Sequence, residues 1–219
     1  MFTGLVQAVG RVERVEPSSS GGRGRRVLIR PGGWNHRPDI GDSIAINGCC
    51  LTVAAVEADA SGPLWAFDAV PETLAKTTLG SLGPGSGVNL EHAVTASTLM
   101  GGHFVQGHVE GVGEVLQVQT GEDWRARIQP PPGLMAFMTP KGSVTVEGVS
   151  LTVAELEPGD AEGVGGWFEI ALIPTTLDKT TLGDLRPGAG VNIETDMVAR
   201  AAIHWARHYF RPGGPGPAR

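Results

Sequence analysis

The sequence contains the same segment twice, and this internal repeat limits the possible folds more than any other feature. Residues 41–57, GDSIAINGCCLTVAAVE, match residues 141–157, KGSVTVEGVSLTVAELE, one hundred positions later. A second pair, VPETLAKTTLG at 70–80 and IPTTLDKTTLG at 173–183, is identical at eight of eleven positions. Because one copy has about 100 residues, the size of a typical small domain, the repeats predict two similar domains.

Within each copy, short apolar stretches alternate with glycine- and proline-containing turns about every 8 to 12 residues. This spacing is typical of a small antiparallel barrel, a fold that also leaves no strand edge exposed. We expect the first strand within residues 1–15, with Leu5, Val9 and Val12 on its apolar face and a bulge at Gly10. The sequence therefore predicts an all-β protein made of two barrels.

The pattern changes after Asp196, where apolar residues follow a helical spacing: Val198, Ala201, Ala202, Trp205 and Tyr209. Such a helix covers its apolar stripe either by packing on its own barrel or by self-association. Asp196 itself is a candidate N-cap of this helix. The expected organisation is a barrel at 1–97, a second barrel at 98–196, an oligomerisation helix at 197–210 and a disordered tail at 211–219.

Charge and cysteine content exclude several functional classes. A net charge of −6 and a pI near 5.5 argue against a nucleic-acid partner, which would require a basic surface. The two cysteines are neighbours, Cys49 and Cys50, so they cannot join distant segments, and no CxxC motif offers a zinc or redox site. The chain has neither an apolar run of about 18 residues nor the regions of a signal peptide. We therefore predict a cytoplasmic protein without a membrane segment or a metal.

The two copies differ chemically at one position, where the first has Cys50 and the second has Ser150. A thiol with an ordinary pKa of about 8.5 can act as a nucleophile when a base or a polar pocket activates it. The alternative is a small buried apolar residue. The hydroxyl at the equivalent position favours a polar role for Cys50. Cys49, which aligns with Val149, is expected to lie in the core.

The junction between the copies, MGGHFVQGHVEG at residues 100–111, places His103 and His108 among glycines. Glycine lets the backbone approach a ligand closely, and histidine can transfer protons or hydrogen-bond a heterocycle. His108 aligns with Leu5, so the barrel framework does not require a histidine there. The spacing of the two is poor for a shared metal. We expect the remaining histidines to be surface or helix residues: His36, His92, His204 and His208.

Several motifs together resemble the riboflavin synthases of the lumazine-binding, two-barrel family. In chain order they are MFTGLVQ, NGCCLTV, PETLAKTTLG, GGHFVQGHV, GVSLTV, IPTTLDKTTLG and VNIE. The resemblance extends from Met1 to the terminal helix. It implies tandem duplicated six-stranded antiparallel Greek-key β-barrels plus a C-terminal α-helix, one pteridine in each barrel, and a homotrimer assembled through the helices. The catalytic site would lie between the first barrel of one subunit and the second barrel of its neighbour.

The resemblance also implies a transferase reaction, the final step of riboflavin biosynthesis. One molecule of 6,7-dimethyl-8-ribityllumazine would donate a four-carbon unit to a second, giving riboflavin and 5-amino-6-(D-ribitylamino)uracil. The acidic C7 methyl group of the lumazine supplies a stabilised carbanion, so no cofactor is implied. The resemblance leaves open whether the trimer joins a larger complex with lumazine synthase.

The family pattern implies particular site residues on this chain. Catalytic contacts are expected from Cys50, His108, Ser150 and Asp196, with Phe2 as a weaker candidate. The first pocket is expected to contain Gly4, Leu5, Val6, Cys49, Cys50, Leu51, Phe67, Asp68, Ala69, Val70, Pro71 and Glu72, with Ser43 and Thr52 as further candidates. The second is expected to contain Gln106, Gly107, His108, Ser150, Leu151, Thr152, Ala171, Leu172, Ile173, Pro174, Thr175 and Thr176, with Lys141 reaching across the subunit boundary.

One departure from the family pattern concerns the second copy, which has Thr175 where the first has Glu72 and where relatives often repeat PET. This change is expected to alter how the second site holds a ribityl chain. The main alternative function is that of the antenna proteins of this fold, which hold lumazine or flavin without catalysis. Those proteins have lost polar residues at the matched positions, whereas this chain retains them, which favours an enzyme. A nucleic-acid-binding barrel is disfavoured by the charge and by the scarcity of strand aromatics.

Overall fold

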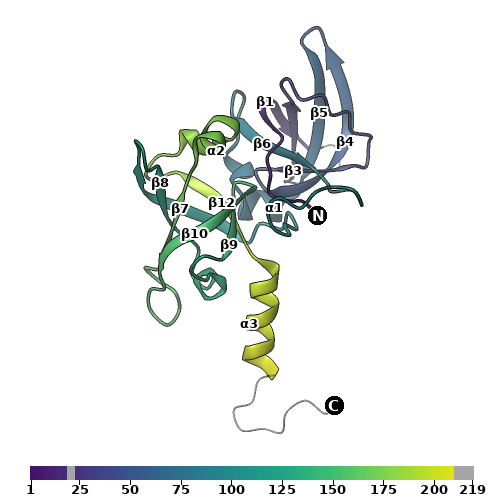
Figure 1. Ribbon diagram of the computed structural model, residues 1–219. Helices are drawn as coiled ribbons and strands as arrows, with labels where there is room; N and C mark the ends of the chain where they lie inside the picture. The colour runs from purple at the N-terminus through teal and green to yellow at the C-terminus, as the bar shows by residue number, and fades with distance from the viewer. Residues whose placement is uncertain (19–22, 210–219) are drawn as a thin grey trace.

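The computed structural model describes residues 1–18 and 23–209, which form two closed barrels and a projecting helix (Figure 1). The first barrel has the strand order β1-β2-β5-β4-β3-β6 with antiparallel neighbours. Its strands are β1 (Ala8–Pro17), β2 (Arg25–Arg30), β3 (Ser43–Ile46), β4 (Cys49–Asp59), β5 (Gly62–Ala69) and β6 (Gly87–His92).

The second barrel repeats this topology, with the strand order β10-β11-β8-β7-β12-β9. Its strands are β7 (Gly111–Gln119), β8 (Arg125–Gln129), β9 (Ser143–Val146), β10 (Val149–Glu157), β11 (Trp167–Ala171) and β12 (Gly190–Thr195). Each barrel encloses its own apolar core, one centred on Trp65 and Phe67 and the other on Phe168 and Ile170. The prediction of tandem six-stranded antiparallel Greek-key barrels followed by a helix is confirmed.

Short helices follow the fifth strand of each barrel and explain the repeated KTTLG motif. They are α1 (Pro71–Lys76) with the 3₁₀ turn η1 (Thr78–Ser81), and α2 (Pro174–Lys179) with η3 (Thr181–Asp184). Proline begins each α-helix because its fixed φ suits the first turn. Each 3₁₀ turn is then capped by a threonine hydroxyl, Thr77 for Leu79 N–H and Thr180 for Leu182 N–H, both at 3.2 Å.

The first strand differs from the expected pattern. Leu5 and Val9 are 46% and 42% exposed, and only Val12 of the three predicted residues is buried. Gly10 is not a bulge, because the irregularity falls between Val12 and Arg14. A Cβ on Gly10 would come within 2.7 Å of Leu90 Cδ1, so this glycine makes room for core side chains. The strand begins only at Ala8, because residues 2–6 before it lie between the two barrels.

The two barrels approach most closely at an equivalent pair of glycines, Gly48 and Gly148. Both have positive φ, and a Cβ on either would lie within 2.8 Å of the other's backbone nitrogen. Reciprocal amide bonds surround this contact: Asn89 Nδ2 donates to Glu147 O, and Asn192 Nδ2 donates to Asn47 O, both at 2.8 Å. The same two asparagines accept at Oδ1 from Thr181 N and Thr78 N of the opposite barrel. The junction is therefore polar, buried and nearly two-fold symmetric.

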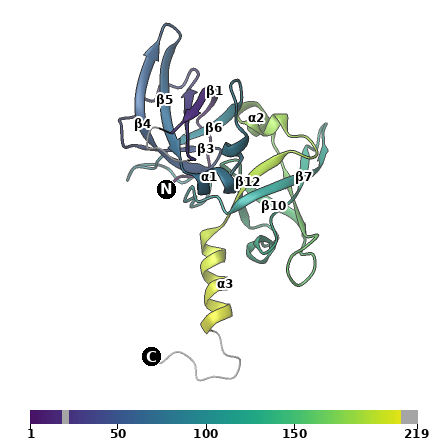
Figure 2. The same cartoon turned by 180° about the vertical axis from the view of Figure 1, so that it is seen from behind.

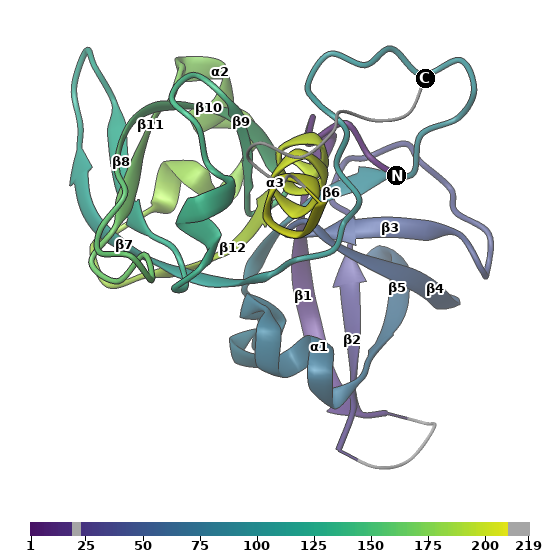
Figure 3. The ribbon, with the colours of Figure 1, turned by 90° about the horizontal axis from the view of Figure 1, so that it is seen from below.

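The last helix, α3 (Met197–Tyr209), projects from the second barrel beside the junction, as Figures 2 and 3 show from behind and from below. Asp196 is its N-cap, since its Oδ1 accepts from Val198 N at 2.8 Å. Val198 and Tyr209 are 63% and 66% exposed, so these residues of the predicted apolar stripe are not covered by the described part of this chain. The predicted tail at 211–219 lies outside the described residues. No helix in the described ranges has the length and apolar character needed to span a bilayer.

Glu147 breaks the symmetry of the junction, because the first copy has Asn47 at the equivalent position. Only 6% of Glu147 is exposed, and its Oε1 accepts from Asn192 N at 2.6 Å and from Thr78 Oγ1 at 3.2 Å. Burial raises the pKa of Glu147 to about 8, because desolvation disfavours the charged carboxylate more than these two hydrogen bonds favour it.

We predict that Glu147 makes stability fall as the pH rises. A carboxyl whose pKa is raised by folding stabilises the folded state fully below its unfolded pKa of 4.5, and this contribution is lost as the pH rises to about 8. Relative to Glu147→Gln, which keeps the acceptor oxygen, the wild-type free energy of unfolding should fall by up to about 1.4 kcal/mol per pH unit in this window. Urea titrations across the window measure the difference; equal slopes for the two proteins would contradict a buried neutral carboxyl.

Candidate active site

Two short segments lie between the barrels, and we call them the first strap (residues 2–6) and the second strap (residues 105–109). Each precedes the first strand of its own barrel. The straps pair with each other, because Phe2 N donates to Val105 O at 2.7 Å and Val105 N donates to Phe2 O at 3.1 Å. Val6 of the first strap packs against the core of the second barrel, and Val109 of the second strap packs against the core of the first. The barrels thus exchange these segments.

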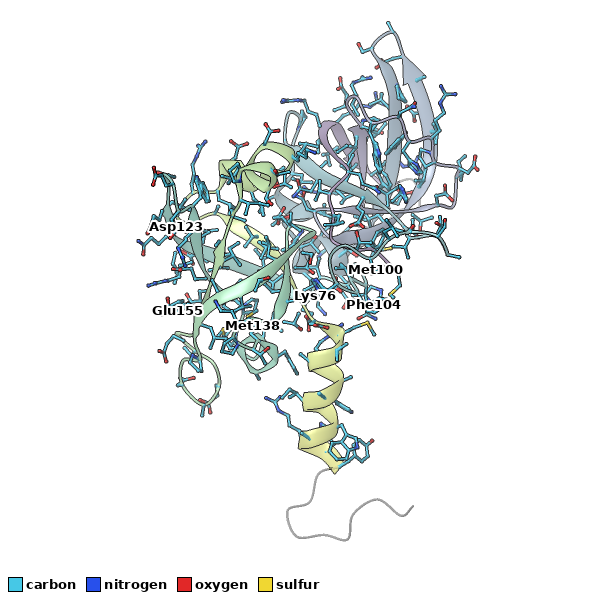
Figure 4. The ribbon with its side chains drawn as sticks, in the orientation of Figure 1. Lys76, Met100, Phe104, Asp123, Met138 and Glu155 are labelled. Atoms are coloured by element: carbon cyan, nitrogen blue, oxygen red, sulfur yellow. The ribbon has the colours of Figure 1, made fainter. Side chains whose placement is uncertain are left out.

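The second strap lies against Cys50 of β4. Cys50 N donates to Gly107 O at 2.9 Å, and a Cβ on Gly107 would lie 2.6 Å from Cys50 Cβ, so only glycine fits this approach. A cavity of about 270 Å³ opens here, and we call it the first site. Figure 4 labels Lys76 of this site on the side of the molecule from which α3 projects. The lining residues are Cys49, Cys50, Val70, Glu72, Thr73, Lys76, Thr77, Gly107, His108 and Val109.

The first strap makes the equivalent contact with β10 of the second barrel. Ser150 N donates to Gly4 O at 2.8 Å, and a Cβ on Gly4 would lie 2.6 Å from Ser150 Cβ. Gly102 approaches from the other side, where a Cβ would lie 2.9 Å from Ser150 Cβ. We call the surroundings of Ser150 the second site. It is the structural counterpart of the first site.

The expected division of residues between the two pockets is wrong in one respect. Gly4, Leu5 and Val6 were expected beside Cys50, and Gln106, Gly107 and His108 beside Ser150. The structure places Gly4 against Ser150 and Gly107 against Cys50. The reason is the exchange of the straps, which a repeat within one chain does not reveal. His108 therefore belongs with the thiol and not with the hydroxyl.

Ser150 has a partner that was not among the predicted site residues. His103 Nδ1 lies 2.7 Å from Ser150 Oγ, and His103 Nε2 lies 3.2 Å from Thr145 Oγ1. Burial lowers the pKa of His103, and the negative charge of Asp196 offsets this in part, so the imidazole is neutral near pH 7. A neutral imidazole bonded to a hydroxyl can receive a proton from it. The only available signal in the sequence was the glycine-flanked position of His103.

The adjacent cysteines differ because successive residues of a strand face opposite sides. Cys49 points into the first core and is 6% exposed, and burial raises the pKa of its thiol to about 12. Cys50 is half-buried on the outer face, in a small cluster with Phe2, Ala45 and Val105. The expectation that Cys49 is a core residue is confirmed. The catalytic role of Cys50 stays a prediction.

The other predicted site residues fall into two groups. Those in the barrel cores are Leu51, Phe67, Ala69 and Leu172. Leu151 is partly buried and packs against the second core. Those at or near the outer faces and rims are Ser43 and Thr52, which pair across β3 and β4; Asp68, which binds Arg26 at 2.6 Å; the exposed Val70, Ala171 and Ile173; Pro71 and Pro174, which begin α1 and α2; and Thr152, Thr175 and Thr176. Glu72 pairs with Lys76 at 3.1 Å, and Thr175 leaves α2 without this ion pair. Lys141 donates to Ala154 O within its own barrel at 3.2 Å.

Two of the histidines expected to be simple surface residues are part of a ring stack. The rings of Trp34, His36 and His92 all contact one another, with centroids 4.9 Å apart for Trp34 and His36, 4.8 Å for His36 and His92, and 6.1 Å for Trp34 and His92. Burial lowers the pKa of His36, and the nearby His92 lowers it further. Stacked rings direct their nitrogens sideways, so this pair is not arranged to share a metal ion. Within the described ranges, no three His, Cys, Asp or Glu side chains are grouped so that they could hold one.

The two sites are built alike but differ in chemistry. Each combines a hydroxyl or thiol on an outward strand face, a glycine backbone that approaches it closely, and a histidine from the segment between the copies. The first joins Cys50 to His108 and the second joins Ser150 to His103. The fold and these sites define a duplicated barrel protein with two structurally equivalent candidate sites that differ in chemistry.

Comparison with known proteins agrees with this class. A family model described as the lumazine binding domain matches twice, at residues 3–93 and 106–196. The riboflavin synthase of Mycobacterium tuberculosis (strain ATCC 25618 / H37Rv) is 42% identical over 91% of this chain and 95% of its own length. That of Escherichia coli (strain K12) is 36% identical over 93% and 90%. A crystal structure of LumP complexed with riboflavin superposes with a TM-score of 0.75 at 27% identity, covering 89% of this chain and 99% of that one.

The chain belongs to the lumazine-binding, two-barrel family of riboflavin synthases. The resemblance stated from its motifs is confirmed. The named relatives are enzymes, which supports catalysis over the antenna-type alternative, although LumP shares the fold.

We predict that the two cysteines react very differently in the native protein. The thiolate attacks iodoacetamide and displaces iodide, so the buried Cys49, with its raised pKa, should react at least about tenfold more slowly than Cys50. Fragment-ion mass spectrometry locates the label within the shared peptide. A Cys50→Ser variant is the control and should show only the slow reaction. Faster labelling at Cys49 would contradict the orientation of β4.

Proposed function

We propose that this chain converts two molecules of 6,7-dimethyl-8-ribityllumazine into riboflavin and 5-amino-6-(D-ribitylamino)uracil. The observation that carries this proposal is the pair of equivalent sites with unequal groups, Cys50 with His108 and Ser150 with His103, in a chain of this family. A reaction between two copies of one substrate needs two similar binding sites. It also needs a difference between them, so that one molecule donates the four-carbon unit and the other accepts it.

The chemistry requires little from the protein beyond positioning and proton transfer. The atoms of two lumazine molecules equal those of the two products, so no oxidant or reductant is consumed. The substrate ring delocalises the carbanion formed at its C7 methyl group, and the protein has to hold the rings in contact and move protons. The glycine backbones of the two straps allow a flat ring to approach closely. The neutral His103, bonded to Ser150, is suited to accept a proton in the second site.

We further propose that the functional unit is a homotrimer and that the reacting pair of sites comes from two subunits. The exposed apolar residues of α3, among them Val198 and Tyr209, support self-association through this helix. Val70 and Ile173, at equivalent positions beside the two sites, are 58% and 63% exposed, as expected of sites that a second copy completes. Lys141 is the proposed cross-subunit contact. Lumazine synthase as a partner and a cytoplasmic location stay predictions.

The turnover test needs only the lumazine substrate. Purified protein incubated with 6,7-dimethyl-8-ribityllumazine should produce riboflavin and the uracil product in equal amounts, followed by absorbance and chromatography. Cys50→Ala and His108→Ala should lower turnover by about 10²-fold or more while binding changes much less. Cys49→Ala should instead lower stability, as a core variant does. Tight binding of lumazine without turnover would establish the antenna-type alternative.

The assembly is tested by removing the helix. Truncation after Asp196 should give a species that is smaller than expected from the lost mass alone in light scattering, because trimers become monomers. A matched control, Tyr209→Ala, removes one exposed ring and should weaken the assembly less. An unchanged assembly after truncation would show that α3 is not the contact.

A further inference from the structure

Two buried carboxylates have no part in the chemistry described so far. Glu91 in β6 and Glu194 in β12 are the last residues of the repeated VNLE and VNIE motifs, and they are 4% and 2% exposed. Burying a carboxylate is costly unless hydrogen bonds compensate for the lost water. Both side chains use their oxygens to hold a strap.

Glu194 holds the second strap through three successive backbone amides. Its Oε1 accepts from Gln106 N at 2.7 Å, and its Oε2 accepts from Gly107 N and His108 N, both at 2.9 Å. Gly107 and His108 line the first site, yet Glu194 is a residue of the second barrel. A carboxylate of one barrel therefore fixes the backbone that completes the site of the other.

Glu91 does the same for the first strap. Its Oε1 accepts from Thr3 N at 2.6 Å and from Thr3 Oγ1 at 2.7 Å, and its Oε2 accepts from Gly4 N at 3.0 Å. Gly4 O in turn accepts from Ser150 N of the second barrel. The arrangement is equivalent to that around Glu194, with the roles of the two barrels exchanged. A carboxylate of the first barrel therefore fixes the backbone at the second site.

The hydrogen bonds depend on a charged, two-oxygen acceptor. Burial raises the pKa of both carboxyls, and the strap N–H groups lower it, so the contacts to the strap are what favour the charged form. An amide in place of Glu194 would turn an NH₂ group toward Gln106 N–H or toward Gly107 and His108 N–H. A buried donor facing a donor is unfavourable, and a cost of about 1.4 kcal/mol corresponds to loosening a strap about tenfold.

We propose that Glu91 and Glu194 are positioning residues of the two pteridine sites, and that each acts on the site of the opposite barrel. Glu194 sets the distance between the second strap and Cys50, and Glu91 sets the distance between the first strap and Ser150. The part of this inference that concerns pteridines rests on the proposed function. The positioning of each strap by a glutamate does not rest on the proposed function, because it concerns only the straps and the two strand residues, Cys50 and Ser150, that they cover.

Cys50 provides a readout of the second strap that needs no ligand. In Glu194→Gln, alkylation of Cys50 by iodoacetamide should accelerate about tenfold, because Gly107 no longer covers the thiol. Glu91→Gln is the matched control, since it alters an equally buried carboxylate and should leave the Cys50 rate within about twofold of wild type. The labelling is measured on full-length protein whose circular dichroism and melting temperature show that it is folded.

The converse test uses Ser150→Cys combined with Cys50→Ser, which moves the reporter thiol to the second site. Here Glu91→Gln should accelerate alkylation and Glu194→Gln should not. If either amide variant does not fold, Glu91→Asp or Glu194→Asp replaces it, because a shorter carboxylate keeps the charge while lengthening the bonds. Equal acceleration at both reporter positions, or none at either, would overturn the crossed assignment.

Ligand binding then tests the part that rests on the proposed function. Titration with 6,7-dimethyl-8-ribityllumazine, followed by fluorescence, should show that each variant weakens one class of sites by about tenfold and spares the other. A crossed thiol pattern without any lumazine binding would sink the proposed function and leave the positioning role intact. Lumazine binding that neither variant alters would remove the positioning role and leave the proposed function standing.

Discussion

The contact on which the structure depends is the approach of two backbones at Gly48 and Gly148. Because no side chain separates these glycines, the asparagine amides of β6 and β12 reach the carbonyl groups of the opposite turn, and the buried N–H and C=O groups there find partners. This close junction brings the outer faces of β4 and β10 near each other. The straps can then lie between the barrels. Cys50 and Ser150 each donate a backbone hydrogen bond to the strap that precedes the opposite barrel.

Duplication makes two sites of one geometry, and a few substitutions make them chemically unequal. Cys50 and Ser150 occupy the same strand position, but a thiol and a hydroxyl bonded to His103 differ in how they handle protons. The change from Asn47 to Glu147 places a neutral carboxyl on one side of an otherwise symmetric junction. Glu72 forms an ion pair with Lys76 in α1, and Thr175 leaves α2 without the equivalent pair beside the second site. Each change preserves the backbone because it replaces a side chain without altering the glycines on which the packing depends.

The repeat, the turn spacing and the helical pattern after Asp196 were sufficient to predict the two barrels and the helix, because these features depend on local periodicity. The separation of Cys49 and Cys50 into core and surface was also predictable from their alignment with Val149 and Ser150. The exchange of the straps was not, since a repeat shows which segments correspond but not which copies they contact. The pairing of His103 with Ser150 was not predictable for a related reason: the two residues are 47 positions apart in the chain. Leu5 misled because it belongs to the first strap, which packs outside its own barrel. Val9 misled because it lies on the outer face of β1, whereas Gly10 and Val12 are buried.

The helix is connected to one strap only, and this is a further source of inequality between the sites. Arg200, one turn into α3, pairs with Glu110 at 3.2 Å and donates to Gln106 Oε1 of the second strap. Gln106 is also one of the residues whose backbone Glu194 holds. In residues 1–18 and 23–209 the first strap has no such neighbour, because β6 of the first barrel is followed by a linker and not by a helix. Arg200 of α3 therefore contacts directly the strap that covers Cys50, whereas Asp196, the N-cap of the helix, acts on the second site through its charge near His103.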